Sequence, residues 1–141
     1  MSAPDREALR VALAGLLTTT GTWQAVYTSQ PKTFDGQSPV ATVHNGPARF
    51  EFLAAGHAPQ AYFYQFVVTN YARRGPDDDE AAAEAQMDAL LMEVLDVVDT
   101  HRREDAWTLL EIVGASAPDY YIVDGVQYRA EAVTLEAVVR L

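Results

Sequence analysis

The stretch YFYQFVVTNY, residues 62–71, and the acidic stretch DDDEAAAEAQMDALLMEVLDVVDTHRR, residues 77–103, decide the fold. The first stretch places apolar side chains on both faces of an extended chain. This pattern is typical of a central β-strand that is covered on both sides. The second opens with four carboxylates, and the N-terminal end of a helix favours negative charge. Together they predict a central strand followed by a long helix.

The predicted helix, from Pro76 to Arg103, has two different faces. At about 100° per residue, one face gathers apolar side chains that are expected to pack on a sheet. The opposite face is acidic, yet Met92 and Leu95 lie among its carboxylates like an interface core inside a polar rim. The alternative is a solvated face that tolerates two apolar residues. The inward residues are Met87, Leu90, Leu91, Val94 and Val98, and the outward carboxylates are Glu84, Asp88, Asp96 and Asp99.

The N-terminal part predicts a helix, a short strand and a long loop. A capping box at Ser2-Ala-Pro-Asp5 predicts the helix start, and the threonines of Thr18–Thr20 with the following glycine end it. Residues 23–28 suit a short strand, and residues 29–39 are rich in turn-forming residues. A loop of this length is either solvated or ordered against a partner, with Phe34 as its anchor. The expected buried helix residues are Leu9, Ala12, Leu13, Leu16 and Leu17.

Two hairpins are predicted, one on each side of the central strand and long helix. The first joins Val40–His44 to Ala48–Leu53 through Asn45-Gly46-Pro47, because an Asn-Gly turn between apolar runs is a strong hairpin signal. The second turns at Asp124-Gly125, a pair that readily adopts positive φ. A further strand is expected over Trp107–Val113.

The final strand, residues 126–141, changes its apolar phase near Ala132. Even-numbered positions are apolar before this point and odd-numbered positions after it. A β-bulge of one extra residue, or a strand that leaves one sheet for another, would produce this change. We therefore regard Val133 and Leu135 as candidate contacts with a neighbouring subunit.

Composition limits the function classes that fit. The 141 residues are expected to form one domain, 1–141, without cysteine and with a net charge of −10. The ten Lys and Arg residues are scattered, which argues against tight nucleic-acid binding. No run reaches the roughly 18 apolar residues of a membrane span, and residues 1–10 lack the order of a signal peptide. We expect a soluble protein, made in a cytosol, that does not bind a membrane.

No motif in the sequence carries chemistry. His44, His57 and His101 are the side chains suited to acid–base work or metal binding near neutral pH, and none lies in a motif. Ser116 lacks the second glycine of a nucleophile elbow, and the only lysine, Lys32, is not in a phosphate-binding loop. We therefore expect no catalytic residue, no metal and no cofactor, and hence no enzyme.

The element order and the chain ending Val123-Asp-Gly-Val-Gln-Tyr128 … Leu135-Glu-Ala-Val-Val139 resemble the tail terminator, or tail completion, proteins of long-tailed bacteriophages. The likeness covers nearly the whole chain and is one of order and size. It implies an α+β subunit, with a mostly antiparallel sheet and two main helices, that forms a homo-oligomeric ring, usually a hexamer. It also implies a place in the virion, at the head-proximal end of the tail, after assembly in the host cytoplasm.

The resemblance further implies three partners: the tail tube protein, whose growth the ring stops; a head–tail connector protein; and DNA, which passes through the lumen without specific binding. A ring needs two different patches on each subunit. The residues proposed for them from the sequence are Asp88, Met92, Leu95, Asp96, Asp99, Val133, Leu135 and Phe34. Two alternatives are a small dimeric ligand-binding or regulatory α+β domain and an enzyme using His57 or His44.

Overall fold

The computed structural model describes residues 3–54, 56–74 and 79–141, in which two helices pack on a six-stranded sheet. The sheet order is β1-β2-β3-β6-β4, with β5 paired to β6, and only the β1–β2 pair is parallel. This confirms the expected α+β class. In chain order the elements are α1 (Arg6–Thr19), β1 (Ala25–Tyr27), β2 (Val40–Glu51), β3 (Ala61–Arg73), α2 (Glu80–Thr100), β4 (Leu109–Ala115), β5 (Asp119–Val123) and β6 (Val126–Arg140).

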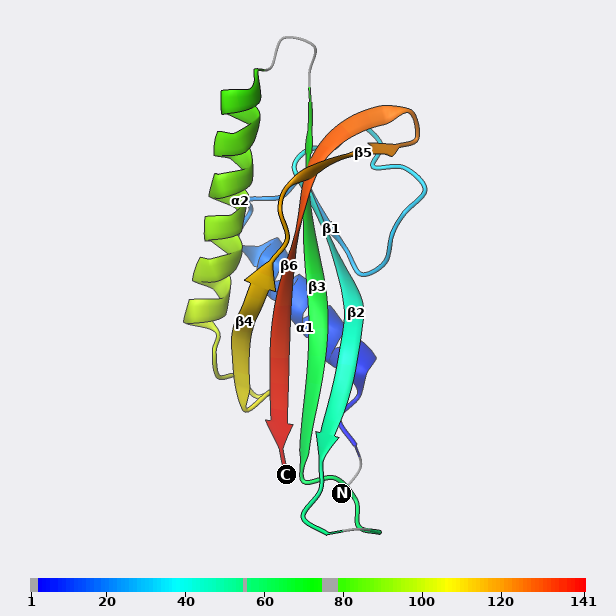
Figure 1. Cartoon of the computed structure of the whole chain (residues 1–141), viewed down its shortest axis with the longest axis vertical. Helices are drawn as coiled ribbons and strands as arrows, with labels where there is room; N and C mark the ends of the chain where they lie inside the picture. The colour runs from blue at the N-terminus through cyan, green and yellow to red at the C-terminus, as the bar shows by residue number, and fades with distance from the viewer. Residues whose placement is uncertain (1–2, 55, 75–78) are drawn as a thin grey trace.

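Both helices lie against the same face of the sheet, α1 over β1 and β2, and α2 over β3, β6 and β4 (Figure 1). We call this the helix-covered face and the opposite one the open face. The core between helices and sheet is continuous, because side chains of α1, α2 and the central strands share one cluster. From the central strands it includes Tyr62, Tyr64, Phe66, Val68, Ala72, Val133, Leu135 and Ala137, and from the helices Leu9, Leu13, Ala14, Leu17, Met87, Leu90, Val94, Val97 and Val98.

Each helix begins at an aspartate. The Asp5 side chain accepts from the backbone N–H of Glu7 at 3.0 Å, and that of Asp79 accepts from Ala82 at 2.7 Å. The expected cap at Ser2 lies outside the described residues, but α1 begins at Arg6, so Asp5 is the cap rather than the fourth residue of a capping box. The expected start of α2 in residues 75–78 also falls outside the described residues.

The central strand is confirmed, because β3 pairs with β2 on one side and with β6 on the other. Its even-numbered side chains from Tyr62 to Val68 point to the helix-covered face. Phe63 and Tyr71 point to the open face, where they join two smaller apolar clusters. The aromatic residues of this strand are therefore divided between two layers of packing.

The first predicted hairpin is wrong. Residues 40–51 form one strand, β2, and Asn45-Gly46-Pro47 lies at a bulge, where the pairing with β3 shifts between Asn45 and Ala48. Gly46 is required there for closeness and not for a turn, since a Cβ would lie 3.1 Å from the Cβ of Gln65. The second hairpin is confirmed, with positive φ at Asp124 (50°) and Gly125 (76°).

The predicted bulge at Ala132 is also wrong. The β3–β6 register runs without a shift from Arg73↔Tyr128 to Ala61↔Arg140, and all pairings belong to one sheet. The apolar positions change from even-numbered to odd-numbered because the two ends of β6 are covered on different faces of the sheet. From Val133 onward the helices cover the odd-numbered positions, whereas Tyr128 and Ala130 pack on the open face against Phe34.

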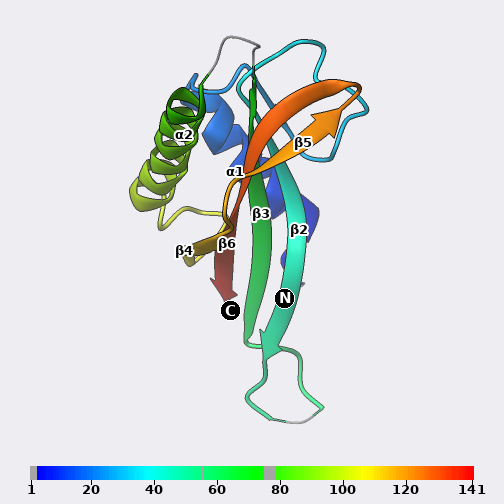
Figure 2. The ribbon, with the colours of Figure 1, turned by 45° about the horizontal axis from the view of Figure 1, so that its top comes forward.

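The loop between β1 and β2 folds back on its own chain. Phe34 is 1% exposed, and its ring centroid lies 5.0 Å from that of Tyr71 and 5.1 Å from that of Tyr128. The loop and the β5–β6 hairpin lie side by side at one end of the molecule (Figures 1 and 2). They cover the open face at that end only.

Candidate assembly surfaces

The histidines of the described residues are not gathered with other metal ligands. His44 lies on β2, His57 precedes β3, and His101 ends α2, so the three histidines are on separate elements. Among residues 3–54, 56–74 and 79–141, no three His, Asp or Glu side chains are placed to share a metal ion. Ser116 is structural, because its hydroxyl accepts from the backbone N–H of Ala132 at 3.1 Å.

Two of the histidines have defined surroundings in the structure. Burial, and then the nearby Arg10 charge, lower the pKa of His44. His101 forms a contact of 2.5 Å from its Nδ1 to Oε1 of Glu104, which fixes its ring beside the end of α2. In the part of the chain that the structure describes, no helix combines the length and apolarity needed to cross a membrane.

The outer face of α2 is acidic with an exposed apolar residue at its centre. Asp88, Asp96 and Asp99 are exposed, and the Met92 side chain is 54% exposed between them. Leu95 is half-buried and turns toward β4. The structure thus brings together on one helix the five residues that the sequence proposed there. Whether they contact a partner stays a prediction.

A groove of about 530 Å³ runs between α2 and β4. Leu95, Val98 and Ile112 supply its apolar lining. Arg102 in its wall is already engaged, since its Nε donates to Oδ1 of Asp99 at 3.1 Å. The remaining charged lining residues are Asp96 and Glu111, so the groove is acidic.

The other three proposed contact residues are inside the subunit. Val133 and Leu135 are fully buried in the main core, because β6 lies between β3 and β4 and beneath the helices. Phe34 is buried by Tyr71 and Tyr128 of the same chain. The prediction that these three residues are surface contacts is wrong, because a second subunit does not reach them in this fold.

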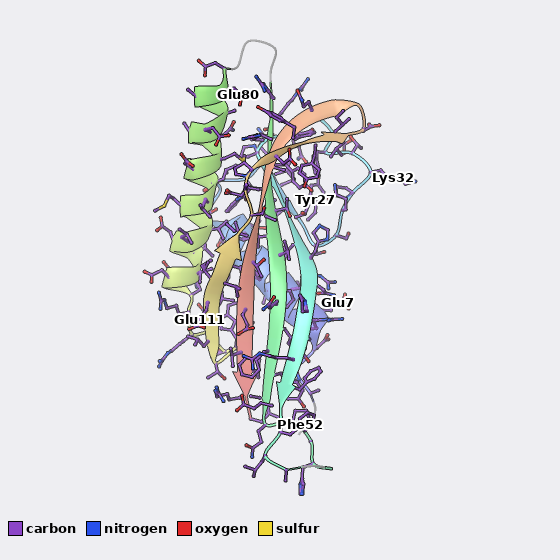
Figure 3. The ribbon with its side chains drawn as sticks, viewed as in Figure 1. Glu7, Tyr27, Lys32, Phe52, Glu80 and Glu111 are labelled. Atoms are coloured by element: carbon purple, nitrogen blue, oxygen red, sulfur yellow. The ribbon has the colours of Figure 1, made fainter. Side chains whose placement is uncertain are left out.

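A group of exposed apolar side chains, which we call the apolar tip, lies at the end of the β2–β3 pair. Phe50, Phe52 and Leu53 are 47%, 54% and 76% exposed, and Leu141 beside them is 48% exposed. The backbone N–H of Leu141 donates to the carbonyl of Gln60 at 2.9 Å, which ties the last residue to the tip. Figure 3 shows Phe52 near the lower end of the molecule, where β2 leads into the loop toward β3. The sequence showed that Phe50 and Phe52 alternate with polar residues. Their place at the end of the molecule was missed because residues 40–53 were predicted to form a hairpin.

A second apolar surface lies on β5, at the opposite end of the long axis (Figure 1). Ile122 is 74% exposed and Tyr121 is 51% exposed. Nearby, Tyr120 links α2 to this hairpin, because its hydroxyl donates to Oε1 of Glu80 at 2.5 Å, and Arg74 donates to the same oxygen at 2.7 Å. This network holds the base of the hairpin against the start of α2.

A hollow lined by arginine lies on the open face, away from the loop and the β5–β6 hairpin. Its volume is about 390 Å³, and Phe63, Leu109 and Val138 form its apolar floor. The Arg49 guanidinium lies 3.7 Å from the centroid of the Phe63 ring, and that of Arg140 lies 5.8 Å from it. The remaining lining residues are Arg103, Thr108, Glu111 and Glu136. We call this region the arginine hollow.

A polar group interrupts the core beneath α2. Glu131 is 8% exposed and its Oε1 has no hydrogen-bond partner among the described residues. Directly opposite in register, Asn70 accepts from Nε1 of Trp23 at 3.0 Å and leaves its own Nδ2 unpaired. Burial, followed by the Asp88 and Glu84 charges, raises the pKa of Glu131. Arg129 forms an ion pair with Glu84 of α2 and therefore does not fully neutralise the Glu131 carboxylate.

No family model matches the chain, and no curated protein matches its sequence. The fold and the surfaces define a small α+β protein with several separate exposed apolar patches.

Proposed function

We propose that this protein is a structural subunit of a bacteriophage tail, a tail terminator that assembles as a ring on the end of the tail tube. In this role the ring stops tube growth and offers a joining surface to a head–tail connector protein. DNA passes through the lumen. The subunit acts in the virion after assembly in the host cytoplasm, and it works without a cofactor and not as an enzyme.

One observation carries the proposal. Exposed apolar side chains are collected at opposite ends of an elongated molecule, with Phe52 and Leu53 at the tip and Ile122 on β5. A further one, Met92, lies on the outer face of α2. Soluble monomers seldom leave several such patches without a partner. A ring subunit on a tube requires them, because it contacts two neighbours, the tube and the connector.

Charge is consistent with the same role. The net charge of −10 disfavours retention of DNA, whose phosphates would be repelled from an acidic lumen. The resemblance in element order supplies the particular position in the tail. A hexamer is the ring size that this resemblance suggests.

The test is the assembly state of the purified protein. We expect closed rings in negative-stain electron microscopy, and a matching discrete mass in light scattering at micromolar concentration. Addition of the tail tube protein should produce capped tubes of limited length. A protein that stays monomeric at every concentration, and leaves tube growth unchanged, would contradict the proposal.

The second candidate is a dimeric ligand-binding domain, and the groove between α2 and β4 is the observation that favours it. Its volume of about 530 Å³ lies within the range of small-molecule sites. Native mass spectrometry of the purified protein distinguishes the two roles. A dimer carrying a small molecule would support the second, and a larger ring without one would support the first.

A further inference from the structure

We propose that the subunits of the ring meet through two named surfaces: the outer face of α2 on one copy packs on the arginine hollow of the next. This inference rests on the proposed function, because it specifies the contact between copies of this chain within the ring. The two surfaces differ in charge and lie on opposite layers of the fold. Each observation below supports their fit.

The first observation is an incomplete layer. Helices cover one face of the sheet, and the loop with Phe34 covers one end of the other face. Over the rest of the open face, the apolar floor at Phe63 and Val138 is shielded by the side chains of Arg49 and Arg140 instead of a second layer. Sheets with apolar residues on both faces are normally covered by secondary structure on both sides. A helix from another copy would supply the missing layer.

The second observation is charge complementarity. Three of the ten cationic residues of the chain, Arg49, Arg103 and Arg140, line the hollow. Of the two carboxylates there, Glu136 is engaged by Arg49 at 3.9 Å and by Gln65 at 3.3 Å. Within the described residues, Arg103 and Arg140 have no ion pair. With three arginines and the two carboxylates Glu111 and Glu136, the hollow has a formal net charge of +1 on an acidic protein.

The facing helix carries the opposite charge. The segment Glu80–Thr100 contains no Lys or Arg, and its outer face exposes Asp88, Asp96 and Asp99. Within the described residues Asp96 has no ion pair. Placing this face on the hollow brings free carboxylates to free guanidinium groups, which is the pairing that aligns partners and rejects wrong orientations.

The third observation is shape. Ala85 and Ala89 are exposed beside Met92 on the outer face of α2, so the backbone of this helix can approach a partner closely. Met92 projects beyond them and is flexible enough to fit an irregular hollow.

The fourth observation is the direction of the contact. α2 lies on the helix-covered face, whereas the arginine hollow lies on the open face. Contact between two different surfaces is heterologous, and repetition of a heterologous contact closes a ring when the rotation between copies permits. Each copy then uses one surface toward each neighbour and leaves the apolar tip and β5 free for the tube and the connector.

Charge reversal tests the pairing directly in the full-length protein. We expect Asp96→Arg, and separately Arg140→Glu, to raise the concentration for half-maximal ring assembly by about tenfold or more, because each places like charges together. We expect the double variant to recover most of the assembly, since the pair is restored with its polarity reversed. Arg73→Glu is the matched control for charge, since Arg73 is exposed on β3 outside the hollow, and it should assemble normally. Circular dichroism confirms that every variant is folded.

The outcomes separate this inference from the proposed function. Rings in the wild type and in both single variants would overturn the contact and leave the ring function standing. Folded single variants without rings, together with a folded double variant that also forms none, would overturn the direct pairing. A wild type that forms no ring, alone or with tube protein, would overturn both. Loss of rings in both single variants with recovery in the double variant would establish the contact.

Discussion

The two faces of the sheet are built from the same strands but are covered differently. On the helix-covered face, Phe66 and Val68 are fully buried beneath helices that span the sheet. On the open face, Phe34 seals one end, and long arginine side chains shield the other. A cover made of backbone layers is part of the fold, whereas a cover made of long side chains can be displaced by a partner. We therefore expect the proposed contact between copies to form on the side covered by arginine side chains, where it does not require the subunit to unfold.

The largest expected loss of stability comes from a substitution on the helix-covered face. Phe66→Ala removes a fully buried ring from the main core and should lower the free energy of unfolding by about 3–5 kcal/mol. Urea unfolding measures it. Phe52→Ala, at the exposed tip, is the matched control and should change stability by less than about 0.5 kcal/mol. Equal losses in the two variants would show that the helix layer is not what stabilises the fold.

The sealed end of the open face should come second. Phe34→Ala should cost about 3 kcal/mol, the lower end of the range for a buried phenylalanine, because a loop can collapse partly into the space. Hydrogen exchange should speed up in residues 29–39 and at Gln24, whose N–H bonds to the carbonyl of Pro39. Exchange that rises uniformly across β3 and α2 would instead make this loop part of the main cooperative core.

A smaller effect is expected at Glu131, the buried carboxyl on the helix-covered face. Its raised pKa means that the folded protein holds this proton to higher pH than the unfolded chain does. Ionisation therefore costs stability above the folded pKa, and the cost disappears as the pH falls below the unfolded value of about 4.3. Glu131→Gln should gain about 1 kcal/mol near pH 7.5 and nothing near pH 4.

Thermal unfolding over this pH range provides the measurement for Glu131. The control is Glu51→Gln at the end of β2, where the side chain is exposed. It should leave the pH dependence unchanged. A Glu131→Gln variant that is less stable at pH 7.5 would show that the ionised carboxylate is stabilised by Arg129 more than it is penalised by burial.

The smallest effect is expected where side chains alone form the cover. Arg49→Ala removes a guanidinium 3.7 Å from the Phe63 ring centroid and should cost about 0.5–1 kcal/mol in the monomer, as exposed cation–π contacts do. Guanidinium chloride unfolding below the assembly concentration measures it. Arg73→Ala is the control and should be neutral. A loss near 3 kcal/mol would mean that the arginine cover is as integral to the fold as the helices.

Local sequence patterns predicted the elements whose geometry is set by near neighbours. The two-sided apolar pattern of residues 62–71 identified β3, and Asp124-Gly125 identified the β5–β6 turn. The inward face of α2 followed from its spacing, and Met87, Leu90, Val94 and Val98 are buried as expected. Each of these depends on contacts that recur every two to four residues.

The wrong predictions required knowledge of distant partners. Asn45-Gly46-Pro47 is a turn signal in isolation, and only the approach of Gln65 makes it a bulge. The phase change at Ala132 reflects Phe34, about a hundred residues away in the chain, covering the opposite face of β6. Likewise, Val133 and Leu135 are apolar because they pack in the core of the subunit. The exposed positions of Asp88, Met92, Asp96 and Asp99 were predictable from helix spacing, whereas the arginine hollow joins residues from β2, β3, β4 and β6.

β2, which forms the edge of the sheet beyond the short β1, and the edge strand β4 each carry an irregularity, and the central β3–β6 pair carries none. β2 shifts between Asn45 and Ala48, β4 shifts between Ile112 and Gly114, and β3–β6 is regular throughout. Pro47 also removes one backbone donor from the rim of the sheet. Such rims resist the strand-by-strand growth that leads to amyloid-like fibres. For a subunit of the proposed ring, these irregular rims disfavour the one mode of association that has no natural end.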